Sequence, residues 1–150
     1  MTAKEAFSMT GQKKMVVNIP VRLRDIDFMG HVNHVVYLTY FEEGRKELIR
    51  SLFGIVDPGD YNFIMAHVTC DFIQPIKISD IVSVEIWVGK IGGKSFEFNY
   101  RIFRPGDDQR ESAIYAKGRS VQVYFDYKKN ISIPIPEFVR ERLQACCREK

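Results

Sequence analysis

Apolar residues recur along this chain at two spacings, and each spacing predicts one kind of element. From about Tyr61 to Phe125 they alternate with polar or mixed residues, which is typical of strands that bury one face. Segments with glycine or proline at 92–94 and 105–108 separate the later runs and predict hairpin turns. A last strand is predicted from about Ser112 to Asp126. The other alternating positions are Ile64, Ala66, Val68, Cys70 and Phe72; Val82, Val84, Ile86 and Val88; and Phe96, Phe98, Tyr100 and Ile102.

A helical spacing precedes these strands. Apolar residues three or four positions apart form one face of a helix predicted from about Asn33 to Phe53, namely Tyr37, Phe41, Gly44, Leu48 and Leu52. Asn33 is a favourable N-cap, and Gly54 is a natural helix stop. Gly44 lies in the middle of the apolar face, where glycine costs about 1 kcal/mol relative to alanine. We therefore expect a sheet to approach the helix closely at Gly44.

The remaining segments complete the order of elements. A first strand is predicted from Met15 to Leu23, and Pro20 places it at a sheet edge or near the strand's end because proline lacks an N–H. A turn at 128–130 leads into a short amphipathic helix from about Pro136 to Cys147. One strand, one long helix and four strands in a meander predict an α+β fold, in which a curved antiparallel sheet of about five strands wraps the helix. The exposed sheet edges are surfaces that a second copy could cover.

Length and composition fit one ordinary domain. The chain has 150 residues, 45% of them apolar and 27% charged; residues 1–14 are predicted to be a flexible lead and residues 15–150 a single domain. The net charge of +3 comes without a block of lysine and arginine, so no nucleic-acid partner is expected. The apolar runs are too short for a membrane span, and three cysteines give no disulfide framework. We therefore expect a cytoplasmic protein in which Cys70 is a buried thiol.

Polar side chains gather just before the predicted helix. The segment from Arg24 to His34 holds two carboxylates, two imidazoles and a carboxamide, from Asp25, Asp27, His31, His34 and Asn33. The first amides of a helix lack intrahelical acceptors, and the helix dipole is positive there. A carboxylate beside such amides is the minimum equipment for hydrolysing an acyl group. The same side chains could suggest a metal site, but an N-cap at Asn33 leaves His31 outside the helix and removes the chelating spacing, so no metal is expected.

The same segment carries a family resemblance. From Arg22 to Arg45 the chain reads R-x-x-D-x-D-x-x-G-H-V-N-x-x-x-Y-x-x-Y-F-E-x-x-R, and residues 120–126 and 133–136 look like the last strand and exit of the same group. The motif and the order of elements resemble the hot-dog-fold acyl-CoA thioesterases, in particular the 4-hydroxybenzoyl-CoA thioesterase-like group with its YbgC-type relatives. The resemblance implies a hot-dog fold, an acyl-CoA substrate, no cofactor, and a homodimer or dimer of dimers.

The resemblance also implies residue roles. Asp27, the second aspartate of the D-x-D pair, is expected to be the catalytic carboxylate. The backbone amide of His34 is expected to bind the thioester carbonyl oxygen, and His31 to orient water or assist proton transfer. The residues expected around the substrate are Gly30, Asn33, Val35 and Tyr37.

Several choices stay open from the sequence. Asp27 acts either as a nucleophile or as a general base, and the acyl group and the thiol carrier, CoA or a carrier protein, are not specified. A second class of function is a hot-dog protein that binds acyl-CoA or another acyl ligand without hydrolysing it. Asp27 discriminates between the two classes, because a carboxylate beside the acyl carbonyl gives a pure binder no advantage. The basic residues considered for the CoA phosphates are Lys90, Arg119, Lys128 and Lys129.

Overall fold

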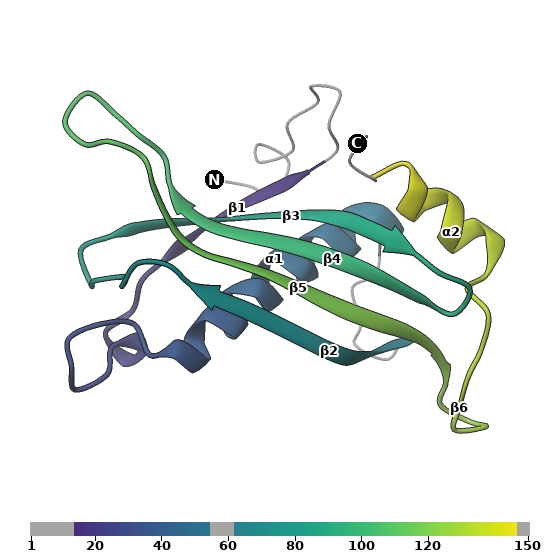
Figure 1. Ribbon diagram of the computed structural model, residues 1–150. Coiled ribbons are helices and arrows are strands. Elements are labelled where there is room, and N and C mark those ends of the chain that lie inside the picture. Colours follow the sequence, from purple (N-terminus) through teal and green to yellow (C-terminus); the bar gives the residue numbers. More distant parts are fainter. Residues whose placement is uncertain (1–13, 55–61, 147–150) are drawn as a thin grey trace.

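The computed structural model describes residues 14–54 and 62–146 (Figure 1). The first elements are β1 (Met15–Pro20), a short 3-10 helix η1 (Leu23–Asp25) and the long helix α1 (His34–Phe53). After them come β2 (Phe63–Phe72), β3 (Ile81–Ile91), β4 (Ser95–Arg104), β5 (Ala113–Asp126), the two-residue β6 (Ile131–Ser132) and the helix α2 (Glu137–Gln144). The lead predicted at 1–14 lies outside the described residues except for its last position.

The main strands form one antiparallel sheet in the order β1-β3-β4-β5-β2, and β6 pairs with the end of β5. The predicted α+β fold, with its long helix and antiparallel sheet, is confirmed. The meander predicted for four strands is wrong for the first of them, because β2 pairs with β5 rather than with β3. β1 lies beside β3 instead, with Met15 opposite Ile86 and Pro20 opposite Ile81. β1 and β2 are thus the two edges of the sheet (Figure 1), as Pro20 indicated for β1.

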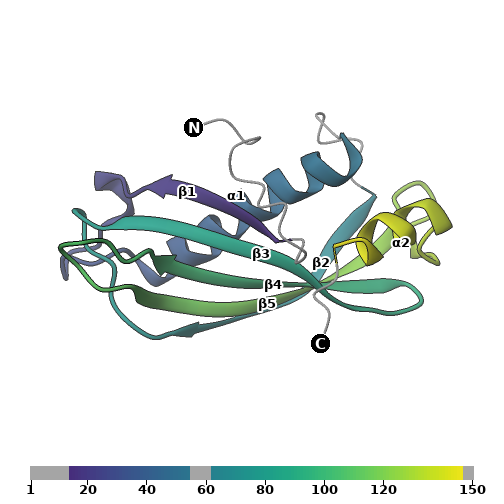
Figure 2. The same ribbon diagram turned by 90° about the horizontal axis from the view of Figure 1, so that it is seen from above.

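α1 lies across one face of the sheet (Figure 2). Its ends are as predicted: Asn33 Oδ1 accepts from the Val35 amide at 3.1 Å, and Gly54 ends the helix with a φ of 64°. Leu52, predicted on the apolar face, is only partly buried. The buried face is wider than the predicted stripe, because a helix packed along a sheet buries more than one row of side chains. Its residues are Tyr37, Tyr40, Phe41, Gly44, Leu48 and Ile49.

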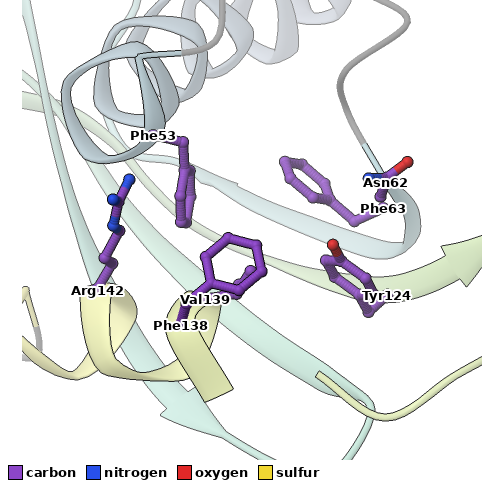
Figure 3. Close-up of a pocket in the computed structure, with 7 residues that line it drawn as sticks. All are labelled: Phe53, Asn62, Phe63, Tyr124, Phe138, Val139 and Arg142. Carbon is purple, nitrogen blue, oxygen red and sulfur yellow. The ribbon is translucent and has the colours of Figure 1, made fainter. Parts of the chain in front are cut away.

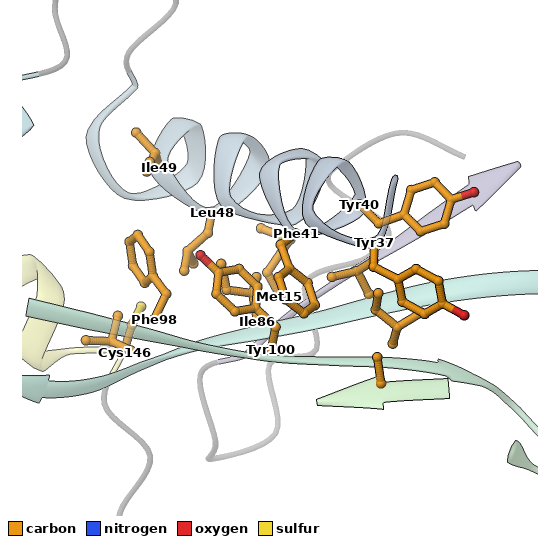
Figure 4. Close-up of a cluster of buried hydrophobic side chains, with 14 of the residues drawn as sticks. Met15, Tyr37, Tyr40, Phe41, Leu48, Ile49, Ile86, Phe98, Tyr100 and Cys146 are labelled. Atoms are coloured by element: carbon orange, nitrogen blue, oxygen red, sulfur yellow. The ribbon is translucent and has the colours of Figure 1, made fainter. Parts of the chain in front are cut away.

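Two glycines allow the core between α1 and the sheet to form (Figure 4). A Cβ at Gly44 would lie 3.0 Å from Val84 Cγ1, which confirms the close approach predicted there. A Cβ at Gly118 in β5 would overlap the ring of Phe41. With that space open, Phe41 stacks on Tyr100 with 4.3 Å between ring centroids. These contacts fix α1 against the sheet and therefore fix where its N-terminus lies.

The other ends of the elements differ modestly from the predictions. β1 ends at Pro20 rather than at Leu23, because η1 follows and the Asp25 carboxylate accepts from the Arg22 amide at 2.9 Å. The C-terminal helix is shorter than the predicted 136–147 and ends at Gln144. No helix in the described parts of the chain is long and apolar enough to span a membrane.

β2 departs from the alternation that predicted it. Its register against β5 shifts between Met65 and His67, which marks a β-bulge. Ile64 is therefore exposed while Val68 is partly buried, although the pattern placed both on one face. Cys70 is partly buried rather than buried. Burial still raises the pKa of its thiol to about 11, so the thiolate is scarce at neutral pH.

Candidate active site

The polar segment between η1 and α1 folds into a closed loop, which we call the Asp27 loop (residues 26–33). Ile26 and Val32 pair as an antiparallel bridge at its base. Inside the bridge, the Asp27 amide donates to the His31 carbonyl at 2.8 Å, and the Gly30 amide donates to the Asp27 carbonyl at 3.1 Å. Gly30 has a φ of 83°, a conformation that favours glycine. The loop is therefore a tight turn that brings Asp27 and His31 together.

The Asp27 carboxylate closes this loop with one of its two oxygens. Oδ1 accepts from the amides of Met29 at 2.9 Å and His31 at 3.4 Å. The side chain is half-buried, and among the described residues it forms no ion pair. Its hydrogen bonds within the described chain all fall on Oδ1, so the carboxylate is held in place while Oδ2 makes none of them.

The start of α1 leaves one amide available beside the loop. The Val35 amide donates to Asn33 Oδ1, and the Val36 amide donates to the Asn33 carbonyl at 2.9 Å. The His34 amide has no acceptor in the described part of the chain. The cap thus uses the Val35 amide, and the neighbouring His34 amide, which we expected to bind the carbonyl oxygen, keeps its hydrogen in reserve for another acceptor.

Asp25 and Tyr40 fasten the Asp27 loop to α1. The Asp25 backbone carbonyl accepts from the Asn33 amide at 2.8 Å. Its carboxylate Oδ2 accepts from the Tyr40 hydroxyl at 2.9 Å. Burial, followed by this hydrogen bond to Asp25, raises the pKa of Tyr40, so the hydroxyl stays protonated and keeps donating. Sequence reasoning missed this contact, because a bond between residues fifteen positions apart leaves no spacing signal.

The chain that leaves β2 supports α1 from the other side. The Val32 amide donates to the Ile76 carbonyl at 2.8 Å. The Tyr37 hydroxyl donates to the Gln74 carbonyl at 3.2 Å, and burial raises its pKa. The Phe72 ring meets the Tyr37 ring edge-on at 5.0 Å. Tyr37, expected near the substrate, is therefore buried beneath the helix start and braces the site from inside.

The other predicted site residues divide into two groups. Gly30 and His34 are exposed, and His31 and Asn33 are half-buried, all within the Asp27 loop or at the adjoining helix start. The basic residues considered for CoA phosphates lie elsewhere, in β3, in β5 and in the β5–β6 turn: Lys90, Arg119, Lys128 and Lys129. Arg119 also pairs with Glu97 at 2.7 Å. Figure 1 places the β5–β6 turn at the opposite end of the molecule from the start of α1.

Exposed apolar side chains lie in the Asp27 loop and in the elements that adjoin it, and sequence reasoning had indicated only Val35 among them. Phe28 is 98% exposed and Met29 67% exposed at the tip of the loop, next to Asp27. Other exposed large apolar residues come from η1, from the first turns of α1 and from the end of β2. We call the whole set the apolar rim: Leu23, Phe28, Met29, Val35, Leu38, Phe72 and Ile73. Exposed apolar side chains that lie beside polar groups are typical of a ligand or protein contact surface.

Residues 14–54 and 62–146 contain no group of side chains that could bind a metal ion. No three histidine, cysteine, aspartate or glutamate side chains there lie close enough together to hold a metal ion. The chemical groups that this site offers are one fixed carboxylate, one free amide at a helix start, and the two imidazoles beside them. Such a set can polarise a carbonyl and either attack it or activate water.

Known proteins resemble this chain in sequence and in fold. The acyl-CoA thioesterase YbgC of Haemophilus influenzae is 29% identical over 93 residues, which cover 58% of this chain and 68% of that protein. A thioesterase from Thermus thermophilus, solved in complex with coenzyme A and Zn, is 32% identical, with a TM-score of 0.72 over 87% of this chain and 91% of that one. A structure from Bacillus stearothermophilus described as a predicted thioesterase has a TM-score of 0.82 at 23% identity. The match covers 91% of this chain and 98% of that one.

A family model gives the broadest match. The model of the thioesterase-like superfamily matches residues 21–143, which include the Asp27 loop, α1 and the strands from β2 to β6. The hot-dog fold that the motif implied is confirmed by the architecture and by these neighbours. The chain belongs to the thioesterase-like superfamily.

Proposed function

We propose that this protein hydrolyses the thioester of an acyl-CoA to a free acid and a thiol, with Asp27 as the catalytic carboxylate. The observation that carries the proposal is the joint placement of Asp27 and His34. The Asp27 loop holds a carboxylate by one oxygen, and the adjoining helix start keeps the His34 amide without an acceptor in the described chain. Membership of the thioesterase-like superfamily supports the same reaction.

The reaction needs two things from these groups. The His34 amide and the positive end of α1 stabilise the negative charge that develops on the thioester carbonyl oxygen. Asp27 Oδ2 then either attacks the carbonyl carbon, forming a mixed anhydride as the thiolate leaves, or accepts a proton from a water that attacks in its place. In the first route water hydrolyses the anhydride. Both routes release the same acid and thiol and regenerate the carboxylate.

The neighbouring residues have supporting roles in this proposal. His31, half-buried in the loop, orients the attacking water or takes part in proton transfer. Asn33 caps α1 and so sets which amides stay free, and Gly30 allows the turn that brings the loop together. Val35 and the rest of the apolar rim contact the acyl chain or a partner subunit.

We also propose that two copies associate through β2. This ten-residue strand is an edge of the sheet, and an unpaired edge next to exposed apolar side chains is a surface that natural proteins cover. Antiparallel pairing of two β2 strands extends the sheet and brings the apolar rim against the partner. The outcome is a homodimer, or a dimer of dimers, in the cytoplasm. Light scattering of the wild type tests this proposal, and a monomer at micromolar concentration contradicts it.

The test of the chemistry is a thiol-release assay. Acyl-CoAs of varied length, aromatic acyl-CoAs and acyl-carrier-protein thioesters are each incubated with the wild type and with Asp27→Asn, whose folding is checked by circular dichroism. We expect turnover of at least one acyl-CoA by the wild type and its loss in Asp27→Asn. Unchanged turnover in the variant removes Asp27 from the mechanism. If the wild type binds acyl-CoA without releasing thiol, the protein is a non-catalytic acyl-ligand binder instead.

A further inference from the structure

A hollow lies at the C-terminal end of α1 (Figure 3), whereas the Asp27 loop adjoins the N-terminal end of this helix. It has a volume of about 220 Å³. Phe53 from the end of α1, Phe63 from the start of β2 and Tyr124 from the end of β5 line it together with two residues of α2, Phe138 and Val139. The twenty residues of α1 span about 30 Å, so within one chain this hollow is separate from Asp27. We call it the α2 pocket.

The lining of the α2 pocket is aromatic and firmly built on one side. Val139 and Tyr124 are buried, and the Phe63 ring packs edge-on against the Phe96 ring at 5.4 Å. Phe138 differs, because its side chain is 59% exposed although its ring borders the hollow. Apolar cavities of about 150 Å³ bind a ligand the size of benzene. The α2 pocket therefore has room for a phenyl ring or a short alkyl chain.

One charged side chain stands at the rim of the α2 pocket. Arg142 belongs to α2, and its guanidinium lies 6.0 Å from the centroid of the Phe53 ring. Its Nη1 donates to the Leu52 carbonyl at 3.0 Å, which holds the group at the end of α1. A guanidinium carries five N–H donors and binds carboxylates in a planar, paired geometry. The Asn62 carboxamide, also in the lining, adds a neutral polar group.

We propose that the α2 pocket binds a small carboxylic acid with a phenyl or short alkyl body. The apolar body lies among the aromatic rings, and the carboxylate lies on Arg142, which is the charged residue among the described residues of the lining. Sites for small molecules combine these features, a mostly apolar wall and few polar groups that fix orientation. The proposal is independent of thioester hydrolysis, although acids of this class are also what such hydrolysis releases.

Calorimetric titration tests the proposal directly. The probes are octanoate, 3-phenylpropanoate and the uncharged octanamide, each titrated at pH 7 into the wild type and four variants. Arg142→Gln removes the charge, and Phe138→Ser removes an exposed ring whose loss leaves the buried core intact. Lys94→Gln removes one positive charge from an exposed residue whose carbonyl accepts from the Tyr124 amide, so it is a nearby charge control. Asp27→Asn reports on the candidate active site.

We expect both acids to bind the wild type, Lys94→Gln and Asp27→Asn with affinities that agree within about twofold. Arg142→Gln should lower the affinity for octanoate by about tenfold or more, since a charge-assisted hydrogen bond is lost. Octanamide should bind the wild type about tenfold more weakly than octanoate for the same reason. Phe138→Ser should lower the affinity for both acids. Melting temperatures confirm that each variant is folded.

Three results would overturn the proposal. Absence of binding to the wild type at millimolar concentrations of both acids removes the site. Loss of binding in Asp27→Asn would show that the acids bind at the Asp27 loop, at the other end of α1. If octanoate and octanamide bind with equal affinity, and Arg142→Gln leaves both affinities unchanged, the α2 pocket is an apolar cavity that does not select acids.

Discussion

The Asp27 loop and the β4–β5 hairpin are each closed by an aspartate in nearly the same way, yet their surroundings differ. In the Asp27 loop, Oδ1 accepts from the amides two and four residues further on, and the Asp27 amide donates to the His31 carbonyl. In the β4–β5 hairpin, Asp107 Oδ1 accepts from the amides of Gln109 and Arg110 at 2.8 Å. The Asp107 amide likewise donates to the Arg110 carbonyl at 2.8 Å.

The difference lies in what surrounds each carboxylate. The hairpin around Asp107 consists of exposed residues from 105 to 112. The Asp27 loop is instead tied to α1 through Asp25 and Tyr40, adjoins the His34 amide, and carries Phe28 and Met29 at its tip. Closing a loop is therefore a common use of aspartate. A helix start and an apolar surface beside the same carboxylate are what separate the Asp27 loop from a turn.

The strongest test of this comparison is to replace both aspartates in the same way. Asn keeps the Oδ1 acceptor and removes the negative charge, so each loop should stay closed. We expect Asp27→Asn to lower kcat by about 10²- to 10⁴-fold, which is the usual contribution of a general base to the rate. Asp107→Asn should leave kcat unchanged within about twofold. Steady-state thiol release measures both, and similar losses in the two variants would mean that Asp27 only closes its loop.

The tie between the loop and α1 should have the next largest effect. Tyr40→Phe removes the hydroxyl that donates to Asp25, which costs about 1 kcal/mol of stability. Because the loop then shifts relative to the helix start, kcat should also fall, by about tenfold to a hundredfold, with little change in KM.

Tyr115→Phe is the matched control for Tyr40→Phe. The Tyr115 hydroxyl accepts from Arg104 Nη1 at 2.8 Å near the base of the β4–β5 hairpin. Its removal should cost a similar free energy of unfolding in urea, without the loss in kcat. If both variants lose turnover to the same degree, the effect of Tyr40 is general destabilisation rather than positioning.

Asn33 offers a smaller test, in which the measured quantity is the free energy of unfolding. Asn33→Ala removes the acceptor of the Val35 amide and should lower the free energy of unfolding by about 1 kcal/mol. Asn33→Asp keeps a capping oxygen and should recover most of that loss. Urea unfolding of the wild type and the two variants measures the order of their stabilities. An Asp variant as unstable as the Ala variant would show that the carboxamide has another role.

The smallest expected effect concerns a third aspartate of the same kind. Asp126 Oδ1 accepts from the amides of Lys128 and Lys129, and the bond from Lys129 is the main reason that the pKa of Asp126 lies below its ordinary value. The folded protein thus favours the ionised form. This contribution to stability is complete above the unfolded pKa of about 4 and disappears as the pH falls through the lower folded value.

Thermal melting between pH 7 and pH 3 checks this prediction. Asp126→Asn should melt slightly below the wild type at neutral pH, and the difference should shrink as the pH falls. A gap that widens in acid would contradict the direction of the pKa shift.

Local signals in the sequence were enough to predict α1 and the loop before it. Asn33, Gly44 and Gly54 each had a conformational or packing reason that operates within a few residues, and the structure confirms all three. The strands were found for the same reason, since alternation is a local pattern. The N-cap at Asn33 also makes His34 the first residue of the helix and leaves Asp27 in the segment before it.

Features that depend on distant parts of the chain could not be predicted in this way. Alternation identified β2 as a strand but not β5 as its neighbour, and it gave no sign of the bulge after Met65. The tie between Tyr40 and Asp25 joins two elements that only the folded chain brings together. The α2 pocket likewise joins the ends of α1, β2 and β5 to α2. Each of these depends on tertiary packing, which overrides local preference.

The bulge in β2 has a further consequence for the behaviour of this protein in a crowded solution. A regular strand at the rim of a sheet offers an evenly spaced template to which any extended peptide can add, and this is how fibrils start. The kink between Met65 and His67 breaks that even spacing. An unrelated peptide matches the template on one side of the kink only, whereas an identical strand related by a twofold axis brings a compensating kink of its own. In the dimer proposed above, we therefore expect the irregularity to favour pairing of two β2 strands over the addition of unrelated peptides.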